Sequence, residues 1–417
     1  MTASNKAPEI SVALLTGGGD RPYVFGLTME LISKGATVDL IGSDELDLPT
    51  FRDIPKLNFL NLRGNQRRDT SLATKVVRIS KYYAKLIRYA VTAKPKIFHI
   101  LWNNKFELFD RTLLTLFYKL MGKKVVLTVH NVNAGKRDLK DSAVNRLTLR
   151  IQYRLADHIF VHTEKMKDEL IKEFGARVHR ITVIPFGINN SVANTSLTPS
   201  EARQRLGILH DEKTILFFGL ITPYKGLEFL VAAFQQILTH RDDCRLIIAG
   251  RPNNCESYWA ALRRTSDKDI QSGRILLRAD YIPDDETEIY FKAADILVLP
   301  YRHVYQSGVL CLGYSFGVPI LAADVGSLKD EIIEGRTGFV FRPEDSVDLA
   351  KTIERYFASD LFANLSSRRQ EIRNFATEKH SWDVVGQLTM SVYGNLVRSV
   401  SLKELPNRQA AKVSPLD

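Results

Sequence analysis

The chain has 417 residues, of which 45% are hydrophobic and 25% are charged, a composition that is ordinary for a folded protein. It is too long for one core of the usual size, so we expect two domains, and its net charge of +11 favours an anionic partner. Its three cysteines form no metal-spaced cluster, its polar amino end lacks the layout of a signal peptide, and no apolar run approaches the roughly 18 residues that span a bilayer. These features argue against a structural metal, secretion and an integral membrane protein, and they predict a cytoplasmic protein.

In the first half of the chain, apolar runs of strand length alternate with patterns of helix length. The predicted strands are residues 10–15, 38–41, 97–102, 125–130, 158–162 and 181–185, and the helices between them include residues 25–34, 108–121, 145–155 and 164–174. Continuous runs of Val, Ile and Leu between helices indicate a parallel sheet that is covered on both faces. Residues 1–190 are therefore expected to form a doubly wound, Rossmann-like α/β domain.

Residues 63–96 carry a marked excess of positive charge. They contain ten Lys or Arg residues and one acidic residue, Asp69, with apolar and tyrosine side chains interleaved among the cations. A basic amphipathic helix of this kind can lie on an anionic membrane surface, or it can be a solvated helix whose apolar side packs on its own domain. Both alternatives stay open, so a peripheral position at the inner membrane face is one expectation for this protein.

A polar, irregular stretch at residues 191–200 is predicted to be a linker, and the alternation of strands and helices then begins again. The predicted strands are residues 214–218, 245–249, 275–278, 296–299 and 320–323, and the helices between them include residues 226–238, 285–293 and 308–316. Residues 201–380 therefore predict a second doubly wound domain, and residues 402–417 a disordered tail. Two such domains would face each other across a cleft, with ligands at the carboxyl ends of the strands.

Three glycines, Gly17, Gly18 and Gly19, follow the first predicted strand. They do not complete the dinucleotide-binding fingerprint, because Pro22 occupies the place of its third glycine. The chain also has no Gly-x-x-x-x-Gly-Lys-[Ser/Thr] loop of the kind that binds nucleoside triphosphates. What remains is a turn that lets a ligand approach the backbone closely, and a simple tight turn is the alternative interpretation.

Histidines stand near the ends of two predicted strands. His130 closes the strand 125–130, where a side chain meets the cleft and titrates near neutrality, so it is a candidate to orient or deprotonate a hydroxyl group. A structural histidine with satisfied hydrogen bonds is the alternative. His158 and His162 lie four residues apart on a strand and not on a helix, so we do not interpret them as a metal-binding pair.

Two further features stand at strand ends of the second half. Lys225 precedes a helix after the first strand of this half, and Ser307 with Gly308 opens a helix after a later strand. A lysine neutralises phosphate charge, and the free N–H groups of a helix N-terminus bind anions. Each feature alone is compatible with an ordinary core helix, but two anion-binding devices that converge on one crevice predict a phosphorylated ligand.

The order of motifs in the second half resembles a known family. The motifs are Phe-Gly-(x)5-Lys-Gly at 218–226, Ala-Asp-Ile-Leu-Val-Leu-Pro at 294–300, Gly-Val-Pro-Ile-Leu-Ala-Ala-Asp-Val-Gly at 317–326 and Glu-Gly-Arg-Thr-Gly-Phe at 334–339. This series resembles the second domain of the family-4 retaining glycosyltransferases of GT-B fold, in a branch with Gln-Ser-Gly-Val in place of the usual two-glutamate motif. The resemblance covers most of residues 10–400.

The resemblance implies transfer of a sugar, as by a hexosyltransferase, from a nucleotide-sugar donor to an acceptor, with retention of the anomeric configuration and without an essential metal or other cofactor. It implies catalytic roles for His130 and Lys225, and a helix at residues 381–401, beginning near Trp382, that crosses back to the first domain. The implied donor-binding residues are Gly17, Gly18, Gly19, Gly219, Lys225, Tyr281, Gln306, Ser307, Gly308 and Val309. The expected acceptor is a glycan, a lipid-linked molecule or a small molecule, in polysaccharide or glycoconjugate biosynthesis.

Three positions depart from the pattern of the family. Leu220 stands where the family usually has arginine, and Val304 and Leu312 stand where it usually has two glutamates. The alternative is therefore a non-catalytic GT-B protein that binds a nucleotide sugar or a glycan as a regulator or partner subunit. A sugar-nucleotide epimerase of the same fold would need a set of acids that we cannot nominate, and a nucleic-acid binder would leave the cleft without a purpose.

Overall fold

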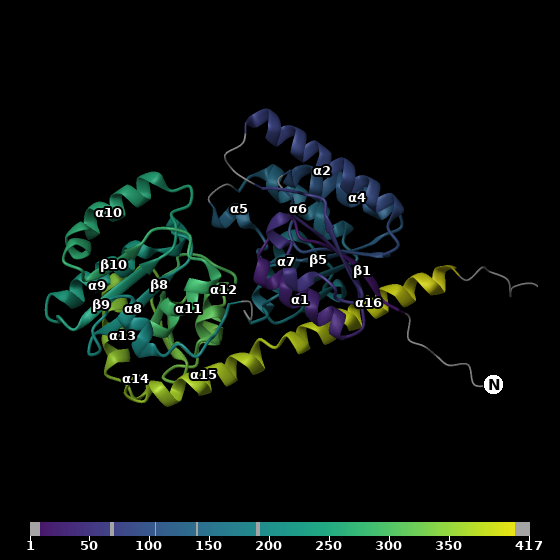
Figure 1. Ribbon diagram of the computed structural model, residues 1–417. Coiled ribbons are helices and arrows are strands. Elements are labelled where there is room, and N and C mark those ends of the chain that lie inside the picture. Colours follow the sequence, from purple (N-terminus) through teal and green to yellow (C-terminus); the bar gives the residue numbers. More distant parts are fainter. Residues whose placement is uncertain (1–8, 67–70, 105, 139–140, 189–191, 405–417) are drawn as a thin grey trace, which may run out of the picture.

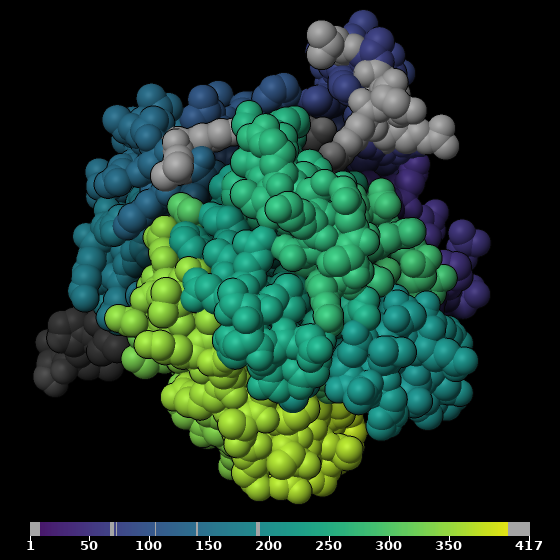
Figure 2. Space-filling model, turned by 90° about the vertical axis from the view of Figure 1, so that its left-hand side faces the viewer, coloured from purple at the N-terminus to yellow at the C-terminus, as the bar shows by residue number. Residues whose placement is uncertain are grey.

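Two parallel sheets, each covered by helices on both faces, build the protein (Figure 1). The computed structural model describes residues 9–66, 71–104, 106–138, 141–188 and 192–404. The fold class predicted from the sequence, two doubly wound Rossmann-like domains, is confirmed. Seen from the side of the second domain, the first domain lies behind it (Figure 2).

The first sheet has seven strands. They are β1 (Ser11–Leu15), β2 (Thr37–Gly42), β3 (Leu57–Asn61), β4 (Ile97–Ile100), β5 (Lys124–Thr128), β6 (His158–Val161) and β7 (Ile181–Val183). Their order in the sheet is β3-β2-β1-β4-β5-β6-β7, and neighbouring strands are parallel. The order reverses beside β1, which places the carboxyl ends of β1, β4 and β5 at a switch point where ligands bind in such sheets.

The sequence of β1 explains why this sheet is covered on both faces. Side chains of a strand alternate between its two faces. Ala13 and Leu15 join one buried cluster, with helices that include α2 (Leu72–Thr92) and α6 (Ala143–Leu155), and Val12 and Leu14 join a second buried cluster, with α1 (Arg21–Ser33). The unbroken apolar run of the sequence is therefore buried on both faces, as in other parallel sheets.

The remaining helical segments of the first domain are shorter. They are α3 (Glu107–Phe109), the π-helical turn η3 (Asp110–Leu114), α4 (Thr115–Leu120), α5 (Ala134–Arg137), α7 (Glu164–Phe174) and the 3-10 turns η1 (Asp44–Leu46), η2 (Pro49–Phe51) and η4 (Val178–Arg180). Among the described helices, none is long and apolar enough to cross a membrane.

The second sheet has six strands. They are β8 (Lys213–Phe218), β9 (Cys244–Ala249), β10 (Ile275–Arg278), β11 (Ile296–Leu299), β12 (Ile320–Ala323) and β13 (Gly338–Phe341), in the order β10-β9-β8-β11-β12-β13. The segments around this sheet are α8 (Pro199–Arg205), η5 (Pro223–Lys225), α9 (Leu227–Leu238), α10 (Glu256–Gln271), α11 (Asp284–Ala293), α12 (Gly308–Ser315), η6 (Lys329–Glu331), α13 (Ser346–Phe357), α14 (Asp360–Ala363) and α15 (Leu365–Lys379). One continuous buried cluster holds these elements together.

The long helix α16 (Trp382–Glu404) joins the two domains. It begins after α15 in the second domain and packs along α1 of the first domain (Figure 1). The indole of Trp382 lies against Gly26 and Gly187, where an added Cβ would stand 2.2 and 2.3 Å from ring atoms. Its Nε1 donates a hydrogen bond to the carbonyl of Ile188 at 2.9 Å. Both glycines are needed there, because any side chain would displace the indole.

The structure differs from the sequence analysis at several boundaries. The strands β3 and β13 were not predicted, and both lie at sheet edges, where β3 has the alternating pattern of a partly exposed strand. The helix α8 begins at Pro199, inside the predicted linker, and residues 189–191 lie outside the described residues. The helix α16 extends to Glu404, so residues 402–404 are helical, and the rest of the predicted tail also lies outside the described residues.

Candidate functional site

A cavity of about 300 Å³ lies between the two domains, beside the carboxyl ends of β1 and β8. Its lining residues come from the start of α1, from the segment that joins the domains, and from the loops after β8 and β11. They are Asp20, Pro22, Tyr23, Phe186, Gly187, Ile188, Gly219, Leu220, Lys225, Gly308, Val309 and Leu312. The place matches the general rule that ligands of doubly wound sheets bind outside the carboxyl ends of the strands.

Lys225 brings a positive charge to this cavity. It ends the short turn η5, and its side chain is only 6% exposed. Its Nζ lies 5.3 Å from the centre of the Tyr301 ring, and it forms no ion pair or side-chain hydrogen bond with any described residue. Burial lowers the pKa of Lys225, which reflects the cost of holding an ammonium group away from water. An anionic ligand would supply the missing counter-charge.

Gly219 allows Lys225 to come close to the backbone. It has a φ of +100°, which favours glycine, and an added Cβ would stand 3.0 Å from Nζ of Lys225. A side chain at this position would therefore be strained and would crowd the ammonium group.

The N-terminus of α12 forms another part of the cavity wall. Ser307 caps this helix, because its Oγ accepts a hydrogen bond from the N–H of Leu310 at 3.3 Å. Gly308 and Val309 follow the cap and line the cavity. The first N–H groups of a helix have no acceptor within the helix, and its dipole attracts negative charge. Lys225 and the start of α12 thus meet at one cavity, as the sequence predicts.

The residues that depart from the family pattern make this wall apolar. Leu220 is 40% exposed and lines the cavity, as does the buried Leu312, while Val304 is also buried. Gln306 is a polar group of the same loop, and its Oε1 is buried without a hydrogen-bond partner among the described residues. A buried amide oxygen without a donor is costly, so it is a candidate to accept a hydrogen bond from a ligand.

Tyr281 and the glycine turn lie outside the lining of this cavity. Tyr281 is 61% exposed, and the guanidinium group of Arg251 lies 5.9 Å from its ring centre. An added Cβ at Gly17 would stand 2.2 Å from the carbonyl oxygen of Trp102, and one at Gly19 would stand 2.0 Å from its indole. At Gly18 the nearest atom would be Nη1 of Arg63, at 2.5 Å. The described glycine turn therefore serves close packing.

His130 follows β5 and lies in an aromatic cluster. Its ring stacks on the indole of Trp102, with ring centres 4.0 Å apart and an angle of 8° between the planes, and Tyr23 packs edge-on against it. Its Nδ1 lies 3.0 Å from Nε2 of His162. Its Nε2 is buried without a partner among the described residues. Burial, with smaller contributions from His162 and His99, lowers the pKa of His130 well below its usual range.

A second cavity, of about 160 Å³, lies in the first domain and reaches His130. It is bordered by residues that follow β4 and β5 and by residues of α6. Its polar lining residues are Asn103, Glu107, Arg111, Thr128, His130, Asn131, Gln152 and Tyr153, with Trp102 beside them. Arg111 is held there by an ion pair with Glu107 at 2.5 Å and by a hydrogen bond that it donates to Oδ1 of Asn145 at 2.8 Å.

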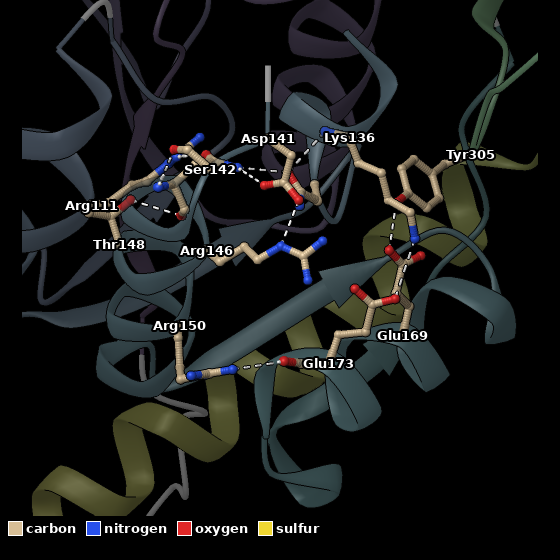
Figure 3. A network of polar contacts seen from close by, with 12 residues as sticks. Arg111, Lys136, Asp141, Ser142, Arg146, Thr148, Arg150, Glu169, Glu173 and Tyr305 are labelled. Carbon is tan, nitrogen blue, oxygen red and sulfur yellow. Dashed lines mark hydrogen bonds and ion pairs between the residues drawn. The ribbon is translucent and has the colours of Figure 1, made fainter. Parts of the chain in front are cut away.

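Direct contacts also bring the domains together across the cleft. The hydroxyl of Tyr305, from the second domain, donates a hydrogen bond to Oε1 of Glu169 on α7 at 2.7 Å (Figure 3). Lys165 Nζ donates to the carbonyl of Gly326 at 3.2 Å. These contacts join the first domain to the loop that precedes α12 and to the turn that follows β12.

Comparison with known proteins accounts for this architecture. Residues 17–192 match the family "Glycosyltransferase Family 4", and residues 212–359 match "Glycosyl transferases group 1". Between them the matches cover both domains. The chain is a family-4 glycosyltransferase. The branch with Gln-Ser-Gly-Val at residues 306–309 is not resolved by these matches.

Curated relatives of this glycosyltransferase carry related names. A D-inositol 3-phosphate glycosyltransferase from Streptomyces avermitilis is 28% identical over 57% of this chain, an alignment that spans about half (52%) of that relative. One of the same name from Acidothermus cellulolyticus is 24% identical over 84% of this chain and 80% of the relative. An uncharacterized glycosyltransferase from Methanocaldococcus jannaschii is 25% identical over 90% of this chain and 94% of the relative.

Solved structures share the GT-B fold of this glycosyltransferase. Sucrose-phosphate synthase from Thermosynechococcus elongatus superposes with a TM-score of 0.73 at 18% identity, over 94% of this chain and all of that one. Anabaena HepE, in complex with UDP-glucose, superposes with a TM-score of 0.68 at 16% identity, over 94% of this chain and all of that one.

Sequence reasoning missed His162, which contacts His130. It was weighed only as a partner of His158 in a metal site. A usable signal was present, because His130 and His162 are each the last residue of a predicted strand, and the carboxyl ends of parallel strands meet at one edge of a sheet.

Proposed function

We propose that this glycosyltransferase moves a sugar from a nucleoside diphosphate-sugar, bound in the interdomain cavity, to a hydroxyl of an acceptor held by the first domain, with retention of configuration. The observation that carries the proposal is the buried ammonium group of Lys225, which forms no ion pair with any described residue and lines the same cavity as the N-terminus of α12. A diphosphate would satisfy both the charge and the free N–H groups.

The proposed chemistry depends on the leaving group. Breaking the bond from the anomeric carbon to the diphosphate oxygen leaves negative charge on the diphosphate. Lys225 and the N–H groups of Gly308 and Val309 would stabilise that charge without moving, because they are already in place. We assign this role to the protein's own groups and propose no essential metal or cofactor. The acceptor hydroxyl then forms the new bond on the same face of the sugar, and its proton passes to the departing diphosphate oxygen.

We assign roles to the remaining polar groups from their buried atoms without partners and from the residues beside them. Gln306 would contact the sugar or the ribose through its buried Oε1. His130 would hold a hydroxyl of the sugar or of the acceptor, because it lies beside both the cavity of the first domain and Tyr23, which lines the interdomain cavity. The acceptor is a glycan, a lipid-linked molecule or a small molecule. The inositol phosphate in the names of the relatives makes phosphorylated polyols the first small molecules to try.

We further propose that the first domain contacts an anionic membrane surface through α2. Residues Tyr82, Leu86 and Ala90 face the core, so one side of the helix packs on its own domain. The outer side carries exposed cations, and it also exposes Val76 (62%) and Ile87 (38%). Exposed cations with apolar side chains among them are typical of helices that lie on anionic lipid.

The donor is identified by a panel experiment. Thermal shift and sugar release are measured in parallel with UDP-glucose, UDP-N-acetylglucosamine, UDP-galactose and GDP-mannose, without added metal and with candidate acceptors. We expect one donor to stabilise the protein and to be consumed. Stabilisation without turnover would instead support a non-catalytic binding protein, which the apolar Leu220 and Leu312 in the cavity wall also favour.

The role of Lys225 is tested with that donor. Lys225→Ala removes the charge that faces the diphosphate, so turnover is expected to fall by about 100-fold, as when one preorganised donor to a developing charge is removed. Lys351→Ala, an exposed lysine on α13, is the matched control and should behave as the wild type. Unchanged turnover in Lys225→Ala would contradict the assigned role.

A further inference from the structure

His130 and His162 occupy equivalent places on neighbouring strands. In the parallel pair of β5 and β6, Val126 lies opposite His158 and Thr128 lies opposite Phe160. Two residues further along, His130 and His162 come after the ends of the two strands. Their rings are 4.9 Å apart between centres, and Nδ1 of His130 is 3.0 Å from Nε2 of His162.

The backbone decides which nitrogen of His162 carries the proton. Its Nδ1 lies 3.3 Å from the carbonyl oxygen of Ile184. A carbonyl oxygen only accepts hydrogen bonds, so Nδ1 of His162 must be the N–H group. In a neutral ring the other nitrogen is then an acceptor. Nε2 of His162 therefore offers its lone pair to Nδ1 of His130.

The same argument determines which nitrogen of His130 carries the proton. Because Nε2 of His162 is an acceptor, Nδ1 of His130 must donate to it. His130 is also neutral, so its proton is on Nδ1, and its Nε2 keeps a lone pair. Nε2 of His130 has no partner among the described residues. A buried acceptor without a donor costs free energy, and in a native structure it calls for a functional explanation.

Burial keeps both rings neutral at physiological pH. It lowers the pKa of His162 to about 4, and it lowers that of His130 well below the usual range, with the neighbouring histidine opposing the charge as well. Among the described residues, Tyr23, His99 and His380 are ionisable groups near the pair, and Glu107, Arg111 and Tyr153 line the cavity that His130 borders. The stacked indole of Trp102 and the edge-on ring of Tyr23 fix the plane of the His130 ring. Orientation and tautomer are thus set before a substrate binds.

We propose that His162 is a positioning residue, which fixes the tautomer of His130 so that Nε2 of His130 accepts a hydrogen bond from a substrate hydroxyl. The inference rests on the proposed function, since it takes His130 to contact the sugar or the acceptor. It adds that His130 accepts the hydrogen bond through a lone pair on Nε2 that is in place before the substrate binds. The carbonyl of Ile184 fixes the tautomer of His162, and His162 in turn fixes that of His130. The hydroxyl keeps its proton in this contact, so His130 orients it.

The experiment compares two variants of His162 in the full chain. His162→Phe keeps an aromatic ring but removes the acceptor for Nδ1–H of His130. His162→Gln restores an acceptor, because its amide oxygen can take that hydrogen bond while its NH₂ group donates to the carbonyl of Ile184. His179→Gln replaces an exposed histidine of the same domain and is the matched control.

The primary measurement is ¹⁵N NMR of the histidine rings without substrate. The chain has nine histidines, and the His130 signals are assigned by their loss in His130→Gln. We expect His130 in the wild type to show an N–H at Nδ1 and a bare nitrogen at Nε2. His162→Phe should move the proton to Nε2, and His162→Gln and His179→Gln should keep the wild-type pattern. A protonated Nε2 in the wild type, or an unmoved proton in His162→Phe, would overturn the proposal.

The second measurement is turnover with the donor found in the panel. A lost hydrogen bond to a hydroxyl should lower kcat by about tenfold in His162→Phe, with the KM for the donor unchanged, and His162→Gln should recover most of it. If the tautomer moves as expected but kcat does not fall, His130 does not hold a substrate hydroxyl, and that contact is overturned. If no donor is consumed by any form, the proposed function fails, while the NMR result still decides whether His162 sets the tautomer.

Discussion

At the scale of single residues, the site is defined by buried polar groups that the protein leaves without partners. Lys225 has no counter-ion, Oε1 of Gln306 has no donor, and Nε2 of His130 has no donor among the described residues. Each group costs free energy in the unliganded protein, and that cost is offset only when a ligand supplies the missing partner. A matching ligand should therefore raise the stability of the folded state, because it binds the folded chain alone.

Leu220 offers a residue-level prediction. It is 40% exposed and lines the cavity beside Gly219, so an arginine there can extend into the cavity without being buried. Leu220→Arg should tighten the binding of free UDP or GDP, whichever stabilises the wild type, by about tenfold, because guanidinium–phosphate hydrogen bonds are charge-assisted. Titration calorimetry measures the change. Leu220→Met is the control for size, and equal or weaker affinity in Leu220→Arg would show that the diphosphate does not lie beside this loop.

The sequence allowed some of these residues to be predicted. The place of Lys225, Ser307 and Gly308 followed from strand ends that meet in a parallel sheet, and the structure brings Lys225 and Gly308 to one cavity, with Ser307 as the cap of the adjoining helix. The aromatic neighbours of His130 could not be predicted, because Trp102 and Tyr23 reach it through the packing of separate loops and helices. Contacts of that kind depend on side-chain directions that the pattern of apolar residues does not encode.

At the scale of elements, the central strands and the edge strands β7 and β10 were predicted from the sequence, whereas the edge strands β3 and β13 were not. Buried central strands such as β5 and β11 have continuous apolar runs, which only a parallel sheet explains well. The missed strand β3 is partly exposed and polar at two positions, and the missed strand β13 begins at a glycine, so neither shows a continuous Val, Ile or Leu run. The basic segment 63–96 contains a helix, α2, whose outer side could be recognised from its cations but whose inner contacts could not.

The helix α2 leads to a prediction about membrane binding. Reversing three exposed charges in Lys81→Glu, Lys85→Glu and Arg88→Glu together should weaken sedimentation with phosphatidylserine vesicles by at least about 100-fold at low salt, because the loss of three cations alone costs about 1 kcal/mol each and the new carboxylates are repelled. Added salt should weaken the binding of the wild type in the same direction, because it screens the attraction.

A control must separate this surface from the overall charge of the protein. The same charge change is made at three exposed cations of the second domain, which are Arg264, Lys268 and Lys351. This variant should sediment like the wild type. Equal losses in both variants would show that net charge, and not α2, drives the interaction. Absence of wild-type sedimentation at low salt would exclude the membrane contact itself.

At the scale of the whole molecule, the cavity exists only while the two domains keep their relative position. Two kinds of contact hold it. At the junction, Trp382 bonds to Ile188 and His380 bonds to the carbonyl of Phe186 at 2.9 Å. Across the cleft, Tyr305 bonds to Glu169. The residues of the cavity come from both domains, so the geometry at the junction sets the distance between the donor and the groups around His130.

The charge state of His380 should make the junction sensitive to pH. Its Nδ1 donates to the carbonyl of Phe186 at 2.9 Å, and its Nε2 lies 3.2 Å from Oε2 of Glu331, whose negative charge favours a second proton on the buried ring. Burial opposes this charge, but the adjacent sulfur of Cys311 and the carboxylate of Glu331 outweigh it and raise the pKa of His380 to about 10. Nζ of Lys379 also forms an ion pair with Oε2 of Glu331, at 2.9 Å.

The sign of the effect follows from proton binding. Between the ordinary histidine pKa of about 6.5 and the folded value of about 10, the native chain holds a proton that the unfolded chain has lost. The free energy of unfolding should therefore fall as the pH rises through this window, by at most about 1.4 kcal/mol per pH unit. Denaturant unfolding between pH 6 and 10 measures it. His380→Gln should be less stable than the wild type at pH 6 and should lose most of this slope, whereas His179→Gln should keep it. A wild-type slope that His380→Gln leaves intact would mean that the ring is neutral at the junction and that other groups cause the dependence.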